Sequence, residues 1–366
     1  MSAASFGPEF FRQPQGKHAM KILALDLGKF KSVSCVFDTE LQTTEYWTLR
    51  TDRPYLTAVL QKHQPELVVI EACSISAWVH DLCSELGFRI LVCNPNQEAW
   101  RWRNVKRKTD RDDALKLAKL AALGQLTPVH IPVRATREHR WLVKYRKTIV
   151  GRMNRVQNIV RALFQQHGLA LPVGARCWTH ASLEAIAAQS KPLADCGPEE
   201  LWRGQLAQEL AAYHQLHSEL AGLEKKLTAL AEQDQRIGLL QTIPGVGRVT
   251  AEIVVTHLDR PERFTNARQV SSYAGLTPRQ YQSGLMDRQG GITRRGSRLL
   301  RSALVECAWA MLRYNPWARE TYVRLVGGQK NRKKKAIIAV ARKLLVRCWA
   351  MLRDRQPWSA PAPAAA

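Results

Sequence analysis

Residues 21–38 read KILALDLGKFKSVSCVFD and predict a β-hairpin. The apolar residues 22–25 predict a short buried strand, Gly28 supplies a turn, and residues 32–37 predict the returning strand. Asp26 stands at the end of the first strand, where a carboxylate is costly unless something pairs with it. A divalent cation is one such partner. An ordinary turn aspartate is the alternative, and carboxylates further along the chain bear on the choice.

The composition of the whole chain points to a polyanionic partner. The chain has 366 residues, of which 45% are hydrophobic, with a formal net charge of +24 and a pI of about 10.1. This balance is typical of a nucleic-acid-binding protein of two or three domains. No run of 18 apolar residues suggests a membrane span, and residues 1–19 lack the hydrophobic segment of a secretory signal. The eight cysteines form no C-x-x-C pair, so we expect reduced core residues in a cytosolic protein.

Strands and helices alternate in the first hundred residues. Further strands are predicted over 44–49, 67–70 and 89–93, and helices over 51–64 and 76–86. The alternation predicts a mixed or parallel sheet covered on both faces. Glu71 follows one of these strands as Asp26 follows the first. In open α/β sheets, sites lie beyond the carboxyl ends of the strands, so both carboxylates stand where a site is expected.

The segment KTDRDDALKLAKLAAL carries two more acidic residues of interest. Thr109 is predicted to be the N-cap of a helix over 110–123. Asp110 and Asp113 are three residues apart and therefore share one helix face. An isolated pair of this kind often only complements the helix dipole. Together with the two strand-end carboxylates, however, the pair has the residue types and placement of a two-metal phosphodiester site.

Two long helices are predicted in the middle of the chain. Residues 137–167 form a strongly basic candidate, and residues 201–231 carry leucines at steps of three and four. This stripe predicts a helical hairpin or coiled coil. Packing of the two helices within one chain and a contact between subunits explain the stripe equally well, because periodicity does not distinguish them.

The sequence IPGVG at 243–247 lies between two further predicted helices and resembles a helix-hairpin-helix turn. Gly245 and Gly247 would let backbone N–H groups approach a phosphate, next to the start of a helix that favours an anion. A plain glycine-rich connection is the alternative.

Residues 269–301 mix turn signals with many arginines and are interpreted as a loop system able to surround a phosphate. Ser283 precedes a glycine there, and from composition alone it is a turn serine. A basic run also occupies residues 101–109. The candidate nucleic-acid contacts are Arg101, Arg103, Lys106, Arg107, Lys108, Gly245, Gly247, Arg279, Arg288, Arg294, Arg295 and Arg298.

Taken in order, these segments resemble the DEDD transposases of bacterial insertion sequences, relatives of the Piv-type DNA invertases. The resemblance rests on LALDLGKFKS, VVIEA, KTDRDDA, IPGVG and SSYAGLTPRQYQSG…GITRRGSRLLR, and covers about residues 20–350. It implies an α/β plus all-α protein: a RuvC-like, ribonuclease-H-type N-terminal domain, a long helical hairpin or coiled coil, and a helical C-terminal transposase domain with a helix-hairpin-helix-like turn.

The resemblance also implies the chemistry. The four acidic ligands of Mg²⁺, or of Mn²⁺, map onto Asp26, Glu71, Asp110 and Asp113. The family's serine nucleophile, which forms a covalent phosphoserine link to DNA, maps onto Ser283. The implied partners are donor and target DNA, a guide RNA encoded by the element, and further copies of the chain in a homodimer or homotetramer. The implied location is the bacterial cytoplasm, at the nucleoid.

We therefore expect an extension or leader over 1–19, the catalytic domain over 20–136, a helical linker over 137–235, the transposase domain over 236–355 and a disordered tail over 356–366. The chief alternative is a RuvC-like, metal-dependent junction endonuclease that hydrolyses DNA without a covalent intermediate. An actin-like ATPase or sugar kinase is a third class, because D-x-G-x-x-x-S resembles a first phosphate loop, but no second phosphate loop follows. A non-catalytic nucleic-acid-binding protein is a fourth.

Overall fold

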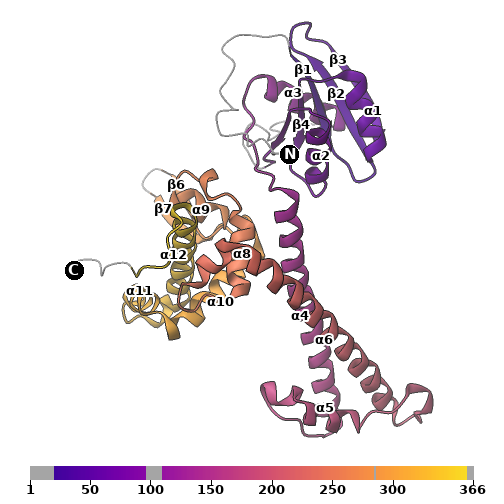
Figure 1. Cartoon of the computed structure of the whole chain (residues 1–366), viewed down its shortest axis with the longest axis vertical. Coiled ribbons are helices and arrows are strands. Elements are labelled where there is room, and N and C mark those ends of the chain that lie inside the picture. Colours follow the sequence, from indigo (N-terminus) through magenta and orange to yellow (C-terminus); the bar gives the residue numbers. More distant parts are fainter. Residues whose placement is uncertain (1–19, 96–108, 284–285, 361–366) are drawn as a thin grey trace. The chain divides into compact units, whose positions relative to one another are not determined.

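The computed structural model describes residues 20–95, 109–283 and 286–360. The chain divides into two compact units, Met1–Pro132 and Val133–Ala366 (Figure 1). The expected extension at 1–19, the basic side chains of 101–108, residue 284 after Ser283 and the last part of the tail lie outside the described residues. Every helix in the described part is too short or too polar to cross a membrane.

The first unit is built on a mixed five-stranded sheet. Its strands are β1 (Lys21–Asp26), β2 (Lys31–Asp38), β3 (Thr44–Arg50), β4 (Leu67–Glu71) and β5 (Ile90–Cys93). Their order across the sheet is β3-β2-β1-β4-β5. The first three strands pair antiparallel, and β4 pairs parallel with both β1 and β5. The predicted β-hairpin and the predicted mixed sheet are confirmed.

Alternation along β1 sends side chains to two different cores. Leu23 and Leu25 pack with residues of α1 (Arg53–His63) and α2 (Ser76–Glu85). Ile22 and Ala24 pack with residues of α3 (Asp110–Ala122). Helices therefore cover both faces, and the buried strands read as nearly continuous apolar runs for this reason.

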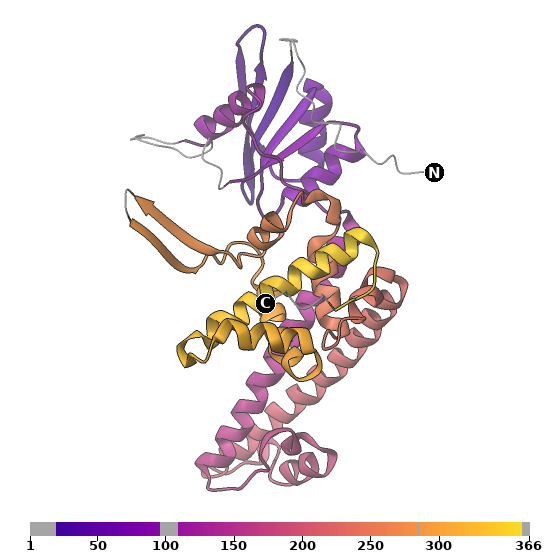
Figure 2. The same cartoon turned by 90° about the vertical axis from the view of Figure 1, so that its left-hand side faces the viewer.

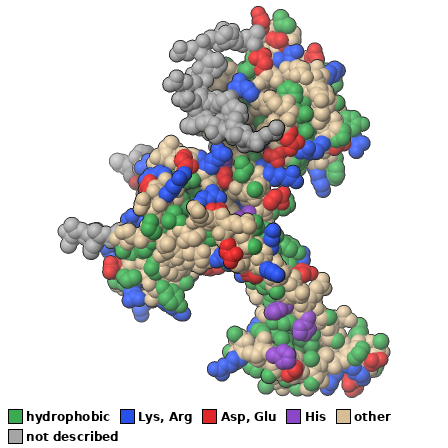
Figure 3. Space-filling view, viewed as in Figure 1, with side chains coloured by type: hydrophobic (Ala, Val, Ile, Leu, Met, Phe, Trp, Pro, Cys, Tyr) green, Lys and Arg blue, Asp and Glu red, His purple; other side chains and the backbone are tan. Residues whose placement is uncertain are grey.

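The second unit begins with two long helices, α4 (Arg134–Gln166) and α6 (Leu201–Gln233). Arg146 pairs with Glu224 near one end, and His167 stacks on Trp202 at 4.4 Å near the other, so the helices run antiparallel. The short helix α5 (His180–Ala187) lies at the end of this hairpin (Figure 1), where histidine side chains gather (Figure 3). Apolar residues of both helices form a shared core there. The helical hairpin is confirmed within one chain.

Among the described residues, six more α-helices and a small sheet follow in the second unit. They are α7 (Gln235–Gln241), α8 (Arg248–Leu258), α9 (Ala267–Tyr273), β6 (Pro278–Ser283), β7 (Met286–Ile292), α10 (Arg298–Tyr314), α11 (Pro316–Val326) and α12 (Lys333–Asp354). One large apolar core joins α7, α8, α10 and α12 and receives Val143 of α4.

The prediction that the C-terminal region is all-helical is wrong, because β6 and β7 form an antiparallel hairpin that extends away from the helices of its own unit (Figure 2). The turn signals around residues 278–283 predict a loop there. Every residue of β6 is exposed, so the strand lacks the apolar alternation by which strands are recognised in a sequence.

Candidate catalytic and nucleic-acid-binding sites

Asp26 and Glu71 end two neighbouring strands. Strands β1 and β4 pair in parallel with Leu25 opposite Ile70, so the next residue on each strand is one of the two carboxylates. Neighbouring strands lie about 4.8 Å apart. Both side chains are partly exposed at this edge of the sheet. The fold therefore brings two carboxylates, 45 positions apart in sequence, to adjacent places.

The same two carboxylates lie on the side of the sheet that α3 covers. Ala24 and Val69, two residues before each carboxylate, pack in the core that contains Ala114 of α3. Because side chains alternate along a strand, Asp26 and Glu71 share that side. Leu27 and Ala72, the residues that follow them, pack in the opposite core, as the alternation requires.

Helix α3 brings the other two predicted carboxylates to this unit. Asp113 precedes the fully buried Ala114 and is itself only 8% exposed, whereas Asp110, one turn earlier, is exposed. An aspartate this buried is uncommon without compensating contacts. Two strand ends and one buried helix position thus present carboxylates to one side of the sheet.

The remaining aspartate of the DRDD sequence has a different role. Asp112 accepts hydrogen bonds from the backbone N–H of Thr109 at 3.0 Å and from its hydroxyl at 2.6 Å. The Thr109 hydroxyl in turn accepts from the N–H of Asp112 at 3.3 Å. This reciprocal capping box fixes the first turn of α3 and confirms the predicted N-cap. Asp112 therefore holds the helix end that carries Asp110 and Asp113.

The donor set suits a magnesium ion. Oxygen ligands are the ones that Mg²⁺ prefers, and the ion is usually held by one or two carboxylates together with substrate phosphates. Across the described ranges 20–95, 109–283 and 286–360, no three His, Cys, Asp or Glu side chains form a ready-made metal-binding group. A cation bound here would therefore draw carboxylates from the strand ends and the helix toward itself.

Ser283 is the last residue of β6 and lies opposite Met286 in the hairpin. Its side chain is exposed. At the base of the hairpin, Gly275 has φ +65°, and a Cβ there would lie 2.1 Å from the carbonyl oxygen of Arg295. Arg301 of α10 donates from Nη1 to the carbonyls of Ala274, Arg295 and Gly296 at 3.2, 2.7 and 3.1 Å. The base is thus closely packed while the serine end is open.

The predicted arginine contacts surround this hairpin. Arg279 and Arg288 lie on the two strands, and Arg294, Arg295 and Arg298 follow β7; all five are exposed. None of them forms an ion pair with another residue that the structure describes. Burial, with the nearby charges of Arg294 and Arg298, lowers the pKa of Arg301. Lysine and arginine side chains are plainly gathered around the hairpin in Figure 3.

The two glycines of the IPGVG turn differ in their surroundings. Gly245 has φ +92°, and a Cβ there would meet Met311 of α10 at 2.9 Å. The thiol of Cys307 donates to the Gly245 carbonyl at 3.4 Å, which ties the turn to the same helix. Gly247 is the N-cap of α8 and has open space around it. Close packing therefore accounts for Gly245, and of the two only Gly247 is open to a ligand.

Sequence reasoning missed a second group of residues in the first unit, centred on Lys29 and Trp78, which line a pocket. Basic and aromatic residues alternate in the sequence at 29–31 and occur close together again at 50–55. This pattern, which is typical of surfaces that bind single-stranded nucleic acid, could have pointed to the group.

Comparison with known proteins decides the family. A family model described as "Transposase", of the DEDD type, matches residues 23–168, and one described as "Transposase IS116/IS110/IS902 family" matches residues 238–323. Together the matched segments make up more than half of the chain. The chain belongs to the IS110-type transposases. The enzyme is a DNA transposase, and the two matched segments of the transposase contain all four predicted carboxylates and Ser283.

Several relatives of this transposase match over most of its length. A transposase for insertion sequence element IS1111A of Coxiella burnetii is 24% identical over 358 residues, covering 95% of this chain and 94% of the relative. A putative transposase of Sinorhizobium fredii is 28% identical over 315 residues, covering 84% and 78%. A pilin gene-inverting protein of Moraxella bovis is 35% identical over 128 residues, covering 35% of this transposase and 40% of its relative.

Proposed function

We propose that this transposase cuts and rejoins DNA with Mg²⁺ held by Asp26, Glu71, Asp110 and Asp113, a set that would also accept Mn²⁺. The observation that carries the proposal is the placement of Asp26 and Glu71 at adjacent strand ends, on the side of the sheet where α3 presents the buried Asp113. The strand order β3-β2-β1-β4-β5, with three antiparallel strands followed by parallel ones, supports a RuvC-like, ribonuclease-H-type domain.

Ser283 is the proposed nucleophile. Its Oγ attacks the phosphorus of a DNA phosphodiester as its proton leaves, the bond from phosphorus to the leaving sugar oxygen breaks, and that oxygen takes up a proton. The phosphoserine link keeps one phosphoester bond for each bond broken, so a second hydroxyl can reseal the strand without ATP. Bound Mg²⁺ would lower the pKa of the attacking hydroxyl and stabilise charge on the phosphoryl oxygens. Exposed arginines around the hairpin, such as Arg279 and Arg288, would neutralise the same oxygens.

The partners follow from charge and from the family. Donor and target DNA are the proposed substrates, and a guide RNA encoded by the element, which the family resemblance implies, is the proposed source of sequence recognition. The basic helix α4 and the run at 101–108 are proposed backbone contacts. A homodimer or homotetramer would supply the acidic residues and Ser283 of one composite site from different subunits. The proposed location is the bacterial nucleoid.

A panel of three matched variants tests the carboxylates. We expect Asp110→Asn and Asp113→Asn to lose strand cleavage on cognate DNA and RNA while they still bind both, because each loses a metal ligand. Asp112→Asn should still cleave, because the side chain of Asp112 caps helix α3 and is not one of the proposed metal ligands. Full activity of Asp110→Asn or Asp113→Asn would show that the assignment is wrong.

The serine is tested by the covalent product. Wild-type protein should form a protein–DNA adduct that survives denaturation, and Ser283→Ala should not. An adduct formed by Ser283→Ala would mean that another residue is the nucleophile. Efficient cutting by the wild type without any adduct would instead favour the hydrolytic junction endonuclease.

A further inference from the structure

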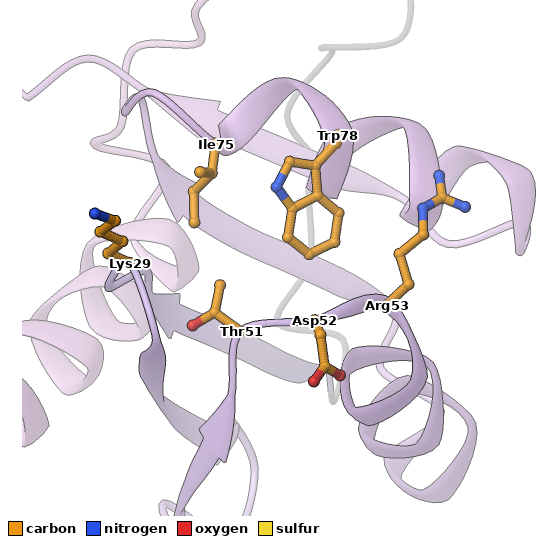
Figure 4. A pocket seen from close by; sticks show the side chains of 6 residues that line it. All are labelled: Lys29, Thr51, Asp52, Arg53, Ile75 and Trp78. Carbon is orange, nitrogen blue, oxygen red and sulfur yellow. The ribbon is translucent and has the colours of Figure 1, made fainter.

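A pocket of about 440 Å³ lies in the first unit. Three segments contribute its walls: the turn between β1 and β2, the start of α1 and the start of α2. The lining residues are Lys29, Thr51, Asp52, Arg53, Ile75 and Trp78. Figure 4 shows Ile75 and Trp78 projecting from the α2 side toward Thr51, with Lys29 at one end.

The pocket and the carboxylates share one edge of the sheet. Lys29 comes three residues after Asp26, and Ile75 comes four residues after Glu71. The carboxylates lie on the face of the sheet that α3 covers, whereas Trp78 packs in the core on the opposite face. The pocket and the carboxylates are therefore at the same end of the strands but on opposite faces of the sheet. A nucleic-acid strand with one phosphate at the carboxylates could therefore place a neighbouring nucleotide in the pocket.

Two exposed aromatic rings, each with a cation over it, lie next to residues that line the pocket. Phe30 is 74% exposed and has the Lys29 ammonium 4.9 Å from its ring centre. Tyr55 is 50% exposed and has the Arg50 guanidinium 5.4 Å from its ring centre. Exposed rings beside cations are the usual surface for unpaired nucleotides, whose bases stack while their phosphates are neutralised.

Asp52, the acidic residue that lines the pocket, does not cancel the positive charge at the pocket mouth. Asp52 pairs with Arg50 at 3.2 Å and accepts the N–H of Tyr55 at 3.1 Å as the N-cap of α1. Arg53 pairs with Glu85 at 3.1 Å. Among the described residues, Lys29 forms no ion pair, so its charge is available to an anion at the mouth of the pocket.

We propose that this pocket binds an unpaired nucleotide of the DNA strand that the transposase cuts, next to the reacting phosphate. The base lies against the indole of Trp78 and the side chain of Ile75, and its phosphate lies near Lys29. The volume falls in the range of pockets for small ligands, about 300–1,000 Å³. The inference rests on the proposed function, because the acidic site fixes where the strand runs.

The test uses the full-length protein and a 20-residue oligo(dT) that carries one 4-thiothymidine, in EDTA so that no cleavage is needed. Irradiation followed by peptide mapping should place the crosslink on a residue that lines the pocket. Trp78→Leu keeps an apolar side chain but removes the ring, and should weaken binding by about tenfold or more. Trp78→Phe keeps a ring and should bind within about threefold of the wild type.

The lysine is tested separately. Lys29→Gln should reduce the slope of log Kd against log salt by about the amount that one phosphate contact contributes. Lys62→Gln is the matched control, because Lys62 lies in the last turn of α1 and the pocket lies at the start of that helix. Crosslinks confined to the second unit, or a folded Trp78→Leu protein that binds as the wild type does, would overturn the proposal. Crosslinking of the pocket by thiouridine-labelled oligo(U) but not by oligo(dT) would also overturn it, in favour of RNA.

If Trp78→Leu does not fold, as judged by its melting curve, the crosslink map of the wild type and the binding affinity of Trp78→Phe decide whether the proposal holds. Failure of the acidic site would look different. Asp110→Asn would then remain active, while the pocket crosslink, measured without metal, would be unchanged.

Discussion

Nε2 of His139 on α4 lies 3.4 Å from Oε1 of Glu252 on α8, a carboxylate with no exposed surface. Arg248 donates to the other oxygen of Glu252 at 2.9 Å and also pairs with Glu224 of α6. Polar and charged groups from three helices thus join the long helical hairpin to the helical core of the second unit. Because a buried charge is costly without its partners, the hairpin and the core should unfold together.

Glu252→Gln removes the central charge of this network. We expect the free energy of unfolding of the second unit to fall by about 1–3 kcal/mol, because Arg248 keeps its charge and loses an ionised acceptor. Denaturant titration measures the change. Glu306→Gln is the control: Glu306 pairs with Lys147 at 3.5 Å but is 72% exposed, so its loss should cost less than about 1 kcal/mol. Equal effects of the two variants would contradict the role given to the network.

His257 should make stability depend on pH. Burial, with the charge of Arg140, lowers its pKa to about 4, and its Nδ1 lies 2.7 Å from the carbonyl of Ile253. Between pH 6.5 and 4 the unfolded chain binds a proton that the folded protein does not, so stability is fully present above pH 6.5 and is lost as the pH falls. We expect a loss of about 2–4 kcal/mol across this range.

Unfolding measured at several pH values isolates the contribution of this residue. His257→Asn can still donate to Ile253 and should show a flatter dependence on pH between 6.5 and 4. His180→Asn, whose side chain is 90% exposed, should follow the wild type. A His257→Asn protein with an unchanged slope would rule this residue out as the source.

Removal of divalent ions should stop DNA cleavage and leave DNA binding in place. EDTA is expected to abolish cutting and adduct formation, and added Mg²⁺ or Mn²⁺ to restore both, because the proposed ligands are all carboxylates. Isothermal titration of Mg²⁺ into the wild type and into Asp26→Asn, each with DNA bound, should show weaker binding by the variant. Cutting that persists in EDTA would exclude the metal mechanism.

Complementation tests whether the site is shared between subunits. Ser283→Ala and Asp26→Asn proteins should each be inactive alone. Mixed together, they should recover part of the wild-type rate of adduct formation, because a mixed dimer can assemble one intact site. Two variants of the same half, Asp26→Asn with Asp110→Asn, serve as the control and should recover nothing. No recovery from the first mixture would favour a site made within one chain.

The IPGVG turn offers a paired test of packing and binding. Gly245→Ala should destabilise the second unit by about 1–3 kcal/mol, because φ is +92° and the added Cβ meets Met311. Gly247→Ala has open space and should melt close to the wild type, yet bind DNA more weakly if a phosphate approaches this backbone. A Gly247→Ala protein that binds normally would favour a plain helix connection.

Local pattern predicted those parts of the fold whose cause is local. The apolar run before Asp26 predicted β1, and the threonine before DRDD predicted the cap of α3. The contact between His139 and Glu252 was out of reach, because 113 positions separate them and neither belongs to a motif. The burial of Asp113 was also hidden, because a first-turn aspartate is ordinarily exposed. The β6–β7 hairpin was not predicted because every residue of β6 is exposed, so that strand lacks the alternation of apolar and polar residues by which a strand is recognised.

The exposure of that hairpin has a consequence for the order of events. An isolated two-stranded sheet is marginally stable in water and every residue of β6 is exposed, so beyond the base held by Arg301 the two strands should open and close freely. Backbone amides of residues 279–283 should then exchange with deuterium far faster than those of α10, and slow down when nucleic acid covers them. Ser283 would acquire a fixed position only after its substrate has docked, and a chain encountering unrelated DNA would leave before its hydroxyl was ever held in place.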